Sequence, residues 1–99
     1  MADAPRILIV TSRYYANITA ELEAGVTEGL EKVGATWEFL EVPGAFEIPL
    51  HVQTLARSRR YAAIVACGLV VNGDIYRHEF VASAVIDGLM RVQLDTGVP

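Results

Sequence analysis

Short apolar runs alternate with stretches of helical periodicity along the chain. Residues 6–11 (RILIVT) form a continuous, β-branched run that is typical of a strand buried on both faces. Apolar residues then recur at spacings of four, four, four and three, with Asn17 as the expected N-cap and Gly34 as the expected stop. The pattern predicts a strand followed by a helix, whose apolar face comprises Ile18, Leu22, Val26, Leu30 and Val33.

The same alternation follows twice more. Residues 36–42 predict a second strand, which Pro43-Gly44 ends, and residues 45–57 predict a helix that tolerates Pro49 in its first turn. Residues 61–71 are the most apolar segment and predict a central strand, and a long helix is expected from about residue 76 to residue 94. The inward faces of these two helices are expected to hold Ile48, Val52 and Leu55, and then Phe80, Val81, Ala84, Val85, Leu89 and Val92.

The order β-α-β-α-β-α predicts one α/β domain spanning residues 1–99. Short connections of this kind give a parallel sheet with right-handed crossovers. Three strands make a thin sheet, and a helix that leads toward Val98-Pro99 usually feeds another strand. We therefore expect a fold that is incomplete at the C-terminus.

The composition indicates that the protein associates with itself. Hydrophobic residues make up 53% of the chain, against about 45–50% in ordinary domains. This excess favours burial against other subunits, or a chain that is the apolar part of something larger. The net charge of −4 and the lack of a basic patch argue against nucleic-acid binding. Without an apolar run near ~18 residues or a signal peptide, we expect no membrane contact and a cytoplasmic location.

Polar and aromatic residues gather in the three loops that follow the predicted strands, residues 12–15, 43–47 and 71–78. Ligands bind at the carboxyl ends of the strands in open α/β sheets. Tyr14 and Phe46 would suit a flat heterocycle, Glu47 offers a carboxylate, and Arg77 or His78 could move a proton or stabilise charge. The same residues could equally be core aromatics and solvated charges. Cys67 lies in an apolar run and is expected to be inert packing.

Four segments resemble the lumazine synthase family. They are residues 9–14 (IVTSRY), 42–49 (VPGAFEIP), 68–73 (GLVVNG) and 80–89. The second is the most specific, because it is very close to the family's Val-Pro-Gly-small-aromatic-Glu-Ile-Pro motif. Together the segments span nearly the whole chain in the right order. The third resembles the family's Gly-apolar-apolar-Ile-x-Gly strand exit.

The resemblance implies a flavodoxin-like fold with three α/β/α layers, cut short after the third helix. It also implies an enzyme of riboflavin biosynthesis, a 6,7-dimethyl-8-ribityllumazine synthase. Such an enzyme joins 5-amino-6-(D-ribitylamino)uracil to 3,4-dihydroxy-2-butanone 4-phosphate and needs no metal or redox cofactor. Its sites lie between the subunits of a pentamer, which can pair into decamers or build shells. A truncated, non-catalytic module that binds a lumazine or flavin, or only self-associates, is the alternative.

The resemblance also assigns site residues. Tyr14 matches the aromatic residue that stacks on the pyrimidine, and Asp74 and Ile75 match the turn near the substrate phosphate. Arg77 stands where the family usually has its proton-transfer His, and His78 lies one residue later. Whether Arg77 or His78 acts stays open, because one residue turns a helical side chain by about 100°. The ribityl chain would be held by Ala45, Phe46 and Glu47, and the pyrimidine edge would be read by Leu69, Val70 and Val71.

Two further departures from the family follow. Asp74 would repel a phosphate if its side chain pointed inward, whereas the family commonly has a small residue there. The basic residues that bind the phosphate in the family lie in a segment that is absent from this sequence. The form of residues 75–78 (IYRH) resembles a divergent branch that tends toward decamers.

Overall fold

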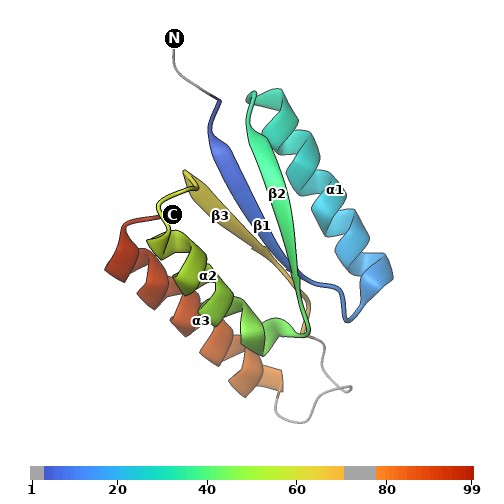
Figure 1. The fold of residues 1–99 in the computed structure, drawn as a ribbon. Helices are drawn as coiled ribbons and strands as arrows, with labels where there is room; N and C mark the ends of the chain where they lie inside the picture. The colour runs from blue at the N-terminus through green and yellow to red at the C-terminus, as the bar shows by residue number, and fades with distance from the viewer. Residues whose placement is uncertain (1–3, 71–77) are drawn as a thin grey trace.

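Three parallel strands form one sheet with helices on both faces. The structure is a computed structural model that describes residues 4–70 and 78–99. The sheet order is β2-β1-β3, and α1 lies on one face while α2 and α3 lie side by side on the other (Figure 1). This confirms the predicted α/β class with a parallel sheet. The elements are β1 (Arg6–Ser12), α1 (Ala16–Lys32), β2 (Thr36–Val42), a short 3-10 helix η1 (Ala45–Glu47), α2 (Ile48–Arg57), β3 (Ala63–Cys67) and α3 (His78–Thr96).

The central strand of the described sheet is β1. It pairs with β2 from Arg6 opposite Thr36 onward, and with β3 from Ile7 opposite Ala63 onward. The prediction that residues 61–71 form a central strand is wrong for this sheet, because β3 lies at its edge. An apolar run indicates that both faces of a strand are buried, but it does not indicate whether the strand pairs on one edge or on both.

The main core lies between the sheet and the α2–α3 pair. Alternation along each strand points Leu8 and Val10 of β1 and Val42 of β2 to this side. The other members of the core cluster are Ile48, Val52, Ala56, Tyr61 and Val92.

The opposite face of the sheet is covered less completely. Among the described residues of α1, Thr19 is the buried one, and it is polar. Ile18 and Leu22 of the predicted apolar face are each 43% exposed, and Val33 is more exposed still. The predicted helix is therefore confirmed, but its apolar face is only partly buried.

The two ends of α1 differ in how well the sequence predicts them. Gly34 has a φ of 74°, its N–H donates to the Glu31 carbonyl, and the Ala35 N–H donates to the Leu30 carbonyl. This is the Schellman stop that a glycine favours. The N-cap prediction is wrong, because the helix begins at Ala16 and the capping position is Tyr15, which leaves Asn17 inside the first turn.

The remaining helices follow the predicted segments with small changes. Residues 45–57 divide into η1 and α2, and Pro49 lies in the first turn of α2 as expected. Val81, Val85 and Val92 of α3 are buried as predicted, but Phe80 and Ala84 are exposed. The prediction that they face inward rested on their apolar character alone and is wrong for these two residues.

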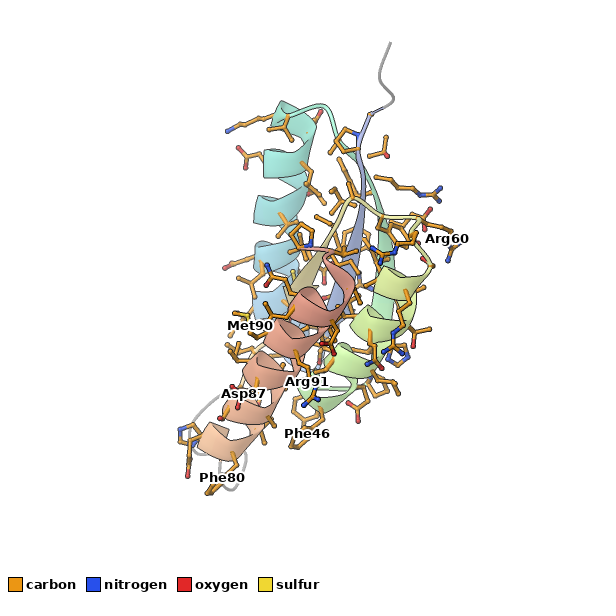
Figure 2. All side chains as sticks on the ribbon, turned by 90° about the vertical axis from the view of Figure 1, so that its left-hand side faces the viewer. Phe46, Arg60, Phe80, Asp87, Met90 and Arg91 are labelled. Atoms are coloured by element: carbon orange, nitrogen blue, oxygen red, sulfur yellow. The ribbon has the colours of Figure 1, made fainter. Side chains whose placement is uncertain are left out.

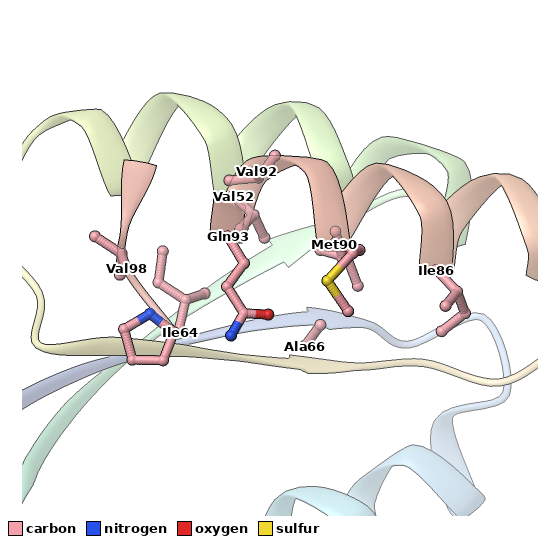
Figure 3. A pocket seen from close by; sticks show the side chains of 10 residues that line it. Val52, Ile64, Ala66, Ile86, Met90, Val92, Gln93 and Val98 are labelled. Carbon is pink, nitrogen blue, oxygen red and sulfur yellow. The ribbon is translucent and has the colours of Figure 1, made fainter. Parts of the chain in front are cut away.

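The outer edge of β3 borders an apolar cavity of about 250 Å³ beneath α3 (Figure 3). Ile64 and Ala66 of β3 line its floor, and Ile86 and Met90 reach into it from α3. The Ile64 N–H donates to the Pro99 carbonyl at 2.9 Å, so the last residue of the chain begins to pair with this edge. Across the described ranges, no helix combines the length and apolarity needed to cross a membrane.

Candidate functional site

A cavity of about 330 Å³ lies at the carboxyl ends of the three strands. It joins the loop after β1, the loop after β2 with η1, and the exit of β3. The sequence predicts a site in the first two loops and at Leu69 and Val70, and parallel strands bring these residues to one edge of the sheet. The lining residues are Ser12, Tyr14, Tyr15, Pro43, Gly44, Ala45, Phe46, Glu47, Leu69, Val70 and Val81.

Two exposed aromatic side chains flank this cavity. Tyr14 is 71% exposed and Phe46 is 60% exposed, although both line it. Tyr14 meets Tyr15 edge to face, with ring centroids 4.9 Å apart. Phe46 projects from the strand-exit end of the molecule, the end at which α3 carries Phe80 (Figure 2). Large rings left open to solvent beside a cavity suit a flat ligand that stacks on them.

The loop after β1 is held by hydrogen bonds to the first turn of α1. The Thr19 hydroxyl donates to the Ser12 carbonyl at 3.2 Å. The Tyr15 carbonyl accepts from the N–H groups of Ile18 and Thr19 at 3.1 and 3.0 Å. These bonds end the strand and start α1 within three residues, so the Tyr14 backbone has little freedom.

The loop after β2 turns tightly at Gly44. The Glu47 N–H donates to the Gly44 carbonyl at 3.2 Å and starts η1. A Cβ atom at residue 44 would lie 3.1 Å from Glu47 Oε2, so the Glu47 carboxylate lies close over the glycine. The Glu47 carbonyl in turn lies 2.8 Å from His51 Nδ1. Glu47 therefore presents its carboxylate at the cavity wall while its backbone is fixed.

Gly68 lies where β3 exits beside the other two strands. A Cβ atom there would lie 3.4 Å from Ile48 Cδ1 and 3.9 Å from Ser12 Cβ. A small residue at this position therefore lets β3 pack closely against the start of α2 and the end of β1.

The structure brings together six of the predicted site residues, namely Tyr14, Ala45, Phe46, Glu47, Leu69 and Val70. Val71, Asp74, Ile75 and Arg77 lie outside the described residues.

His78 is described but does not line the cavity. Its Nδ1 lies 3.1 Å from the Glu79 carboxylate. Val81 lines the cavity and was not assigned to it from the sequence, whereas Tyr15 also lines it and lies in the predicted loop of residues 12–15, without an assigned role. The pattern offered no signal for Val81, because a valine on an inward helix face is equally expected in the core.

Cys67 is buried at the end of β3, as expected for packing. Burial raises the pKa of its thiol, and the charge of Glu23 adds to the effect. A raised pKa keeps the sulfur protonated and a poor nucleophile at neutral pH. Within residues 4–70 and 78–99, no three His, Cys, Asp or Glu side chains gather where they could hold a metal ion.

The sheet order, the crossovers and the cavity at the strand exits define an α/β protein with a candidate ligand pocket at the carboxyl edge of its sheet. The model of the 6,7-dimethyl-8-ribityllumazine synthase family matches residues 4–99. The chain is 57% identical over 97 residues to a 6,7-dimethyl-8-ribityllumazine synthase of Rhodococcus erythropolis, an alignment that covers 95% of this chain and 63% of the relative. The chain therefore belongs to the lumazine synthase family.

Two other relatives carry the name 6,7-dimethyl-8-ribityllumazine synthase 2. The protein from Bradyrhizobium diazoefficiens is 50% identical over 99 residues, covering 99% of this chain and 60% of the relative. The protein from Pseudomonas syringae pv. tomato is 44% identical over 97 residues, covering 95% of this chain and 57% of the relative. The chain thus spans about three fifths of the length of these relatives.

Proposed function

We propose that the protein to which these residues belong is a 6,7-dimethyl-8-ribityllumazine synthase acting in riboflavin biosynthesis. It would join 5-amino-6-(D-ribitylamino)uracil to 3,4-dihydroxy-2-butanone 4-phosphate through a Schiff base, release phosphate and close the second ring. The observation that carries this proposal is the single cavity that unites Tyr14, residues 43–47 and Leu69-Val70. Those are the segments in which the chain resembles the family.

In this proposal the cavity binds the ribitylated pyrimidine. Tyr14 stacks on the ring, which its exposure beside the cavity allows. The Leu69–Val71 backbone reads the polar edge of the ring. The ribityl chain lies along the turn after β2, where Ala45, Phe46 and Glu47 supply an apolar wall and a carboxylate that can accept hydrogen bonds from hydroxyl groups.

The proton transfers are assigned to the segment that begins after Gly73. Arg77 occupies the position four residues after this glycine and is proposed as the group that stabilises developing charge, with His78 as the competing candidate. Asp74 and Ile75 are proposed to lie near the phosphate.

We further propose a pentamer-based homo-oligomer in the cytoplasm, with each site completed by a neighbouring subunit. Exposed apolar side chains on α3 and at the cavity mouth support burial against other subunits. The side chains concerned are Phe46, Phe80, Ile86, Met90 and Leu94.

Turnover of the two substrates by the purified protein that contains these residues tests the proposed function. Product is followed at the absorbance of the lumazine chromophore, and intact mass is measured on the same sample. Product formation is the expected result. Absence of both turnover and lumazine binding would contradict the proposal, whereas lumazine binding without turnover would favour the non-catalytic binding module.

A further inference from the structure

Arg13, the residue before Tyr14, is bound by carboxylates from two other elements. Its Nε donates to Glu23 Oε2 at 3.0 Å, and its Nη2 donates to Glu23 Oε1 at 2.9 Å. This bidentate pair ties the end of β1 to α1. The third nitrogen, Nη1, donates to Glu41 Oε2 at 3.2 Å and ties the same group to β2.

Two further contacts hold this arrangement on the α1 face of the sheet. The Thr11 hydroxyl, whose residue is fully buried, donates to Glu23 Oε2 at 2.7 Å. The Arg13 guanidinium carbon lies 5.7 Å from the centroid of the Phe39 ring. We call Thr11, Arg13, Glu23 and Glu41 the Arg13 clamp. The Glu23 side chain is only 12% exposed, so the clamp is anchored in a shielded carboxylate.

Both ends of the Arg13 clamp adjoin loops that line the candidate site. Arg13 is followed directly by Tyr14, and Glu41 lies two residues before Pro43, which begins the turn that carries Phe46 and Glu47. The register places Thr11 opposite Glu41. The guanidinium therefore bridges the two strands just before their loops diverge.

We propose that Arg13 is a positioning residue, and that the Arg13 clamp fixes the spacing between Tyr14 and the loop of residues 43–47. This inference rests on the proposed function for its ligand, a ribitylated pyrimidine held between the two loops. Arg13 is not a ligand for the substrate phosphate, although it is a cation beside the site. Each of its three guanidinium nitrogens already donates to a carboxylate, and the two negative charges of Glu23 and Glu41 exceed its single positive charge.

The variants Arg13→Lys and Glu23→Gln separate these two roles. Arg13→Lys keeps the positive charge but loses the planar fork that binds a carboxylate through two bonds. Glu23→Gln leaves Arg13 in place and removes the negative charge and one of the two acceptor oxygens of its main partner. The matched control is Glu28→Gln, which breaks an exposed pair with Lys32 on the same helix, far from both loops. Each variant keeps a polar side chain of nearly the same size, and the Arg13 and Glu28 side chains are exposed, so all three variants are expected to fold.

The first readout needs no ligand. Amide hydrogen exchange is measured in residues 12–18 and 42–47 of the unliganded chain. Arg13→Lys and Glu23→Gln are expected to speed exchange in both segments, and Glu28→Gln in neither. Unchanged exchange in the two segments would overturn the proposal.

The second readout is the affinity for 6,7-dimethyl-8-ribityllumazine, which carries no phosphate. Arg13→Lys and Glu23→Gln are each expected to weaken it by roughly threefold to tenfold, and the double variant by no more than the single ones. If only Arg13→Lys has an effect, and that effect is a higher KM for the phosphate-bearing substrate with unchanged lumazine affinity, the proposal is overturned in favour of a phosphate ligand. If the unaltered chain binds no lumazine, the proposed function fails, and the exchange data still decide whether the Arg13 clamp joins the two loops.

Discussion

The contact between α2 and α3 at Gly88 sets a sharp limit on side-chain size. A Cβ atom at residue 88 would lie 3.0 Å from Pro49 Cβ and 3.1 Å from Pro49 Cγ. Both are ring atoms of a proline in the first turn of α2, and a proline ring has no rotamer that moves them away. Gly88→Ala therefore forces the two helices apart by a few tenths of an ångström.

Two opposing effects decide the net change in stability. Replacing a glycine by alanine in an unobstructed helix stabilises it by about 0.5–1 kcal/mol. Overpacking a well-packed contact costs about 1–3 kcal/mol. The expected result for Gly88→Ala is a loss of about 1 kcal/mol in the free energy of unfolding.

Urea denaturation followed by circular dichroism measures this change. Gly29→Ala is the matched control, because Gly29 lies in α1 and its Cβ would meet nothing within 4 Å. This variant should gain about 0.5–1 kcal/mol. The reasoning about the contact is refuted if Gly88→Ala is as stable as the unaltered chain or gains as much as Gly29→Ala.

Two further predictions concern charged groups. Hydrogen bonding from Arg13 holds the pKa of Glu23 below its usual range, and a hydrogen bond from Thr11 lowers it further, while burial opposes the shift. Glu41 and Cys67 are the other titratable groups that face this site. The Arg13 clamp therefore stabilises the fold at neutral pH and loses this effect as the pH falls below about 4. Urea titrations at pH 7 and pH 3 should show a larger drop in the free energy of unfolding for the unaltered chain than for Glu23→Gln. Equal drops in the two proteins would contradict the prediction. Arg77→Ala should lower kcat for lumazine formation more than His78→Ala does, and the reverse order would show that the proposed register is wrong.

Much of the architecture could be predicted because local rules decide it. The apolar run of β1 and the residues of β2 match the predicted segments closely, and Gly34 ends α1 as a left-handed glycine should. The position of β3 could not be predicted in the same way. An edge strand and a central strand have the same apolar run when helices cover their faces, so pairing partners decide the difference.

The location of the candidate site could be predicted, because it follows from the sheet topology. Parallel strands put their described exits at one edge, and six predicted residues line one cavity there. The Arg13 clamp was not predictable, because its two carboxylates lie 10 and 28 residues from Arg13 along the chain. Only the register of β1 with β2 and the docking of α1 bring Glu41 and Glu23 to the guanidinium.

Titration of the purified chain with 6,7-dimethyl-8-ribityllumazine, followed by the fluorescence of the ligand, tests the central claim most directly. Tyr14→Ala is compared with Leu50→Ala, which removes another largely exposed side chain, outside the cavity. The account predicts saturable binding that Tyr14→Ala weakens roughly tenfold and that Leu50→Ala leaves unchanged. An absence of saturable binding, or the same affinity in both variants, would contradict the claim that this cavity holds the pyrimidine.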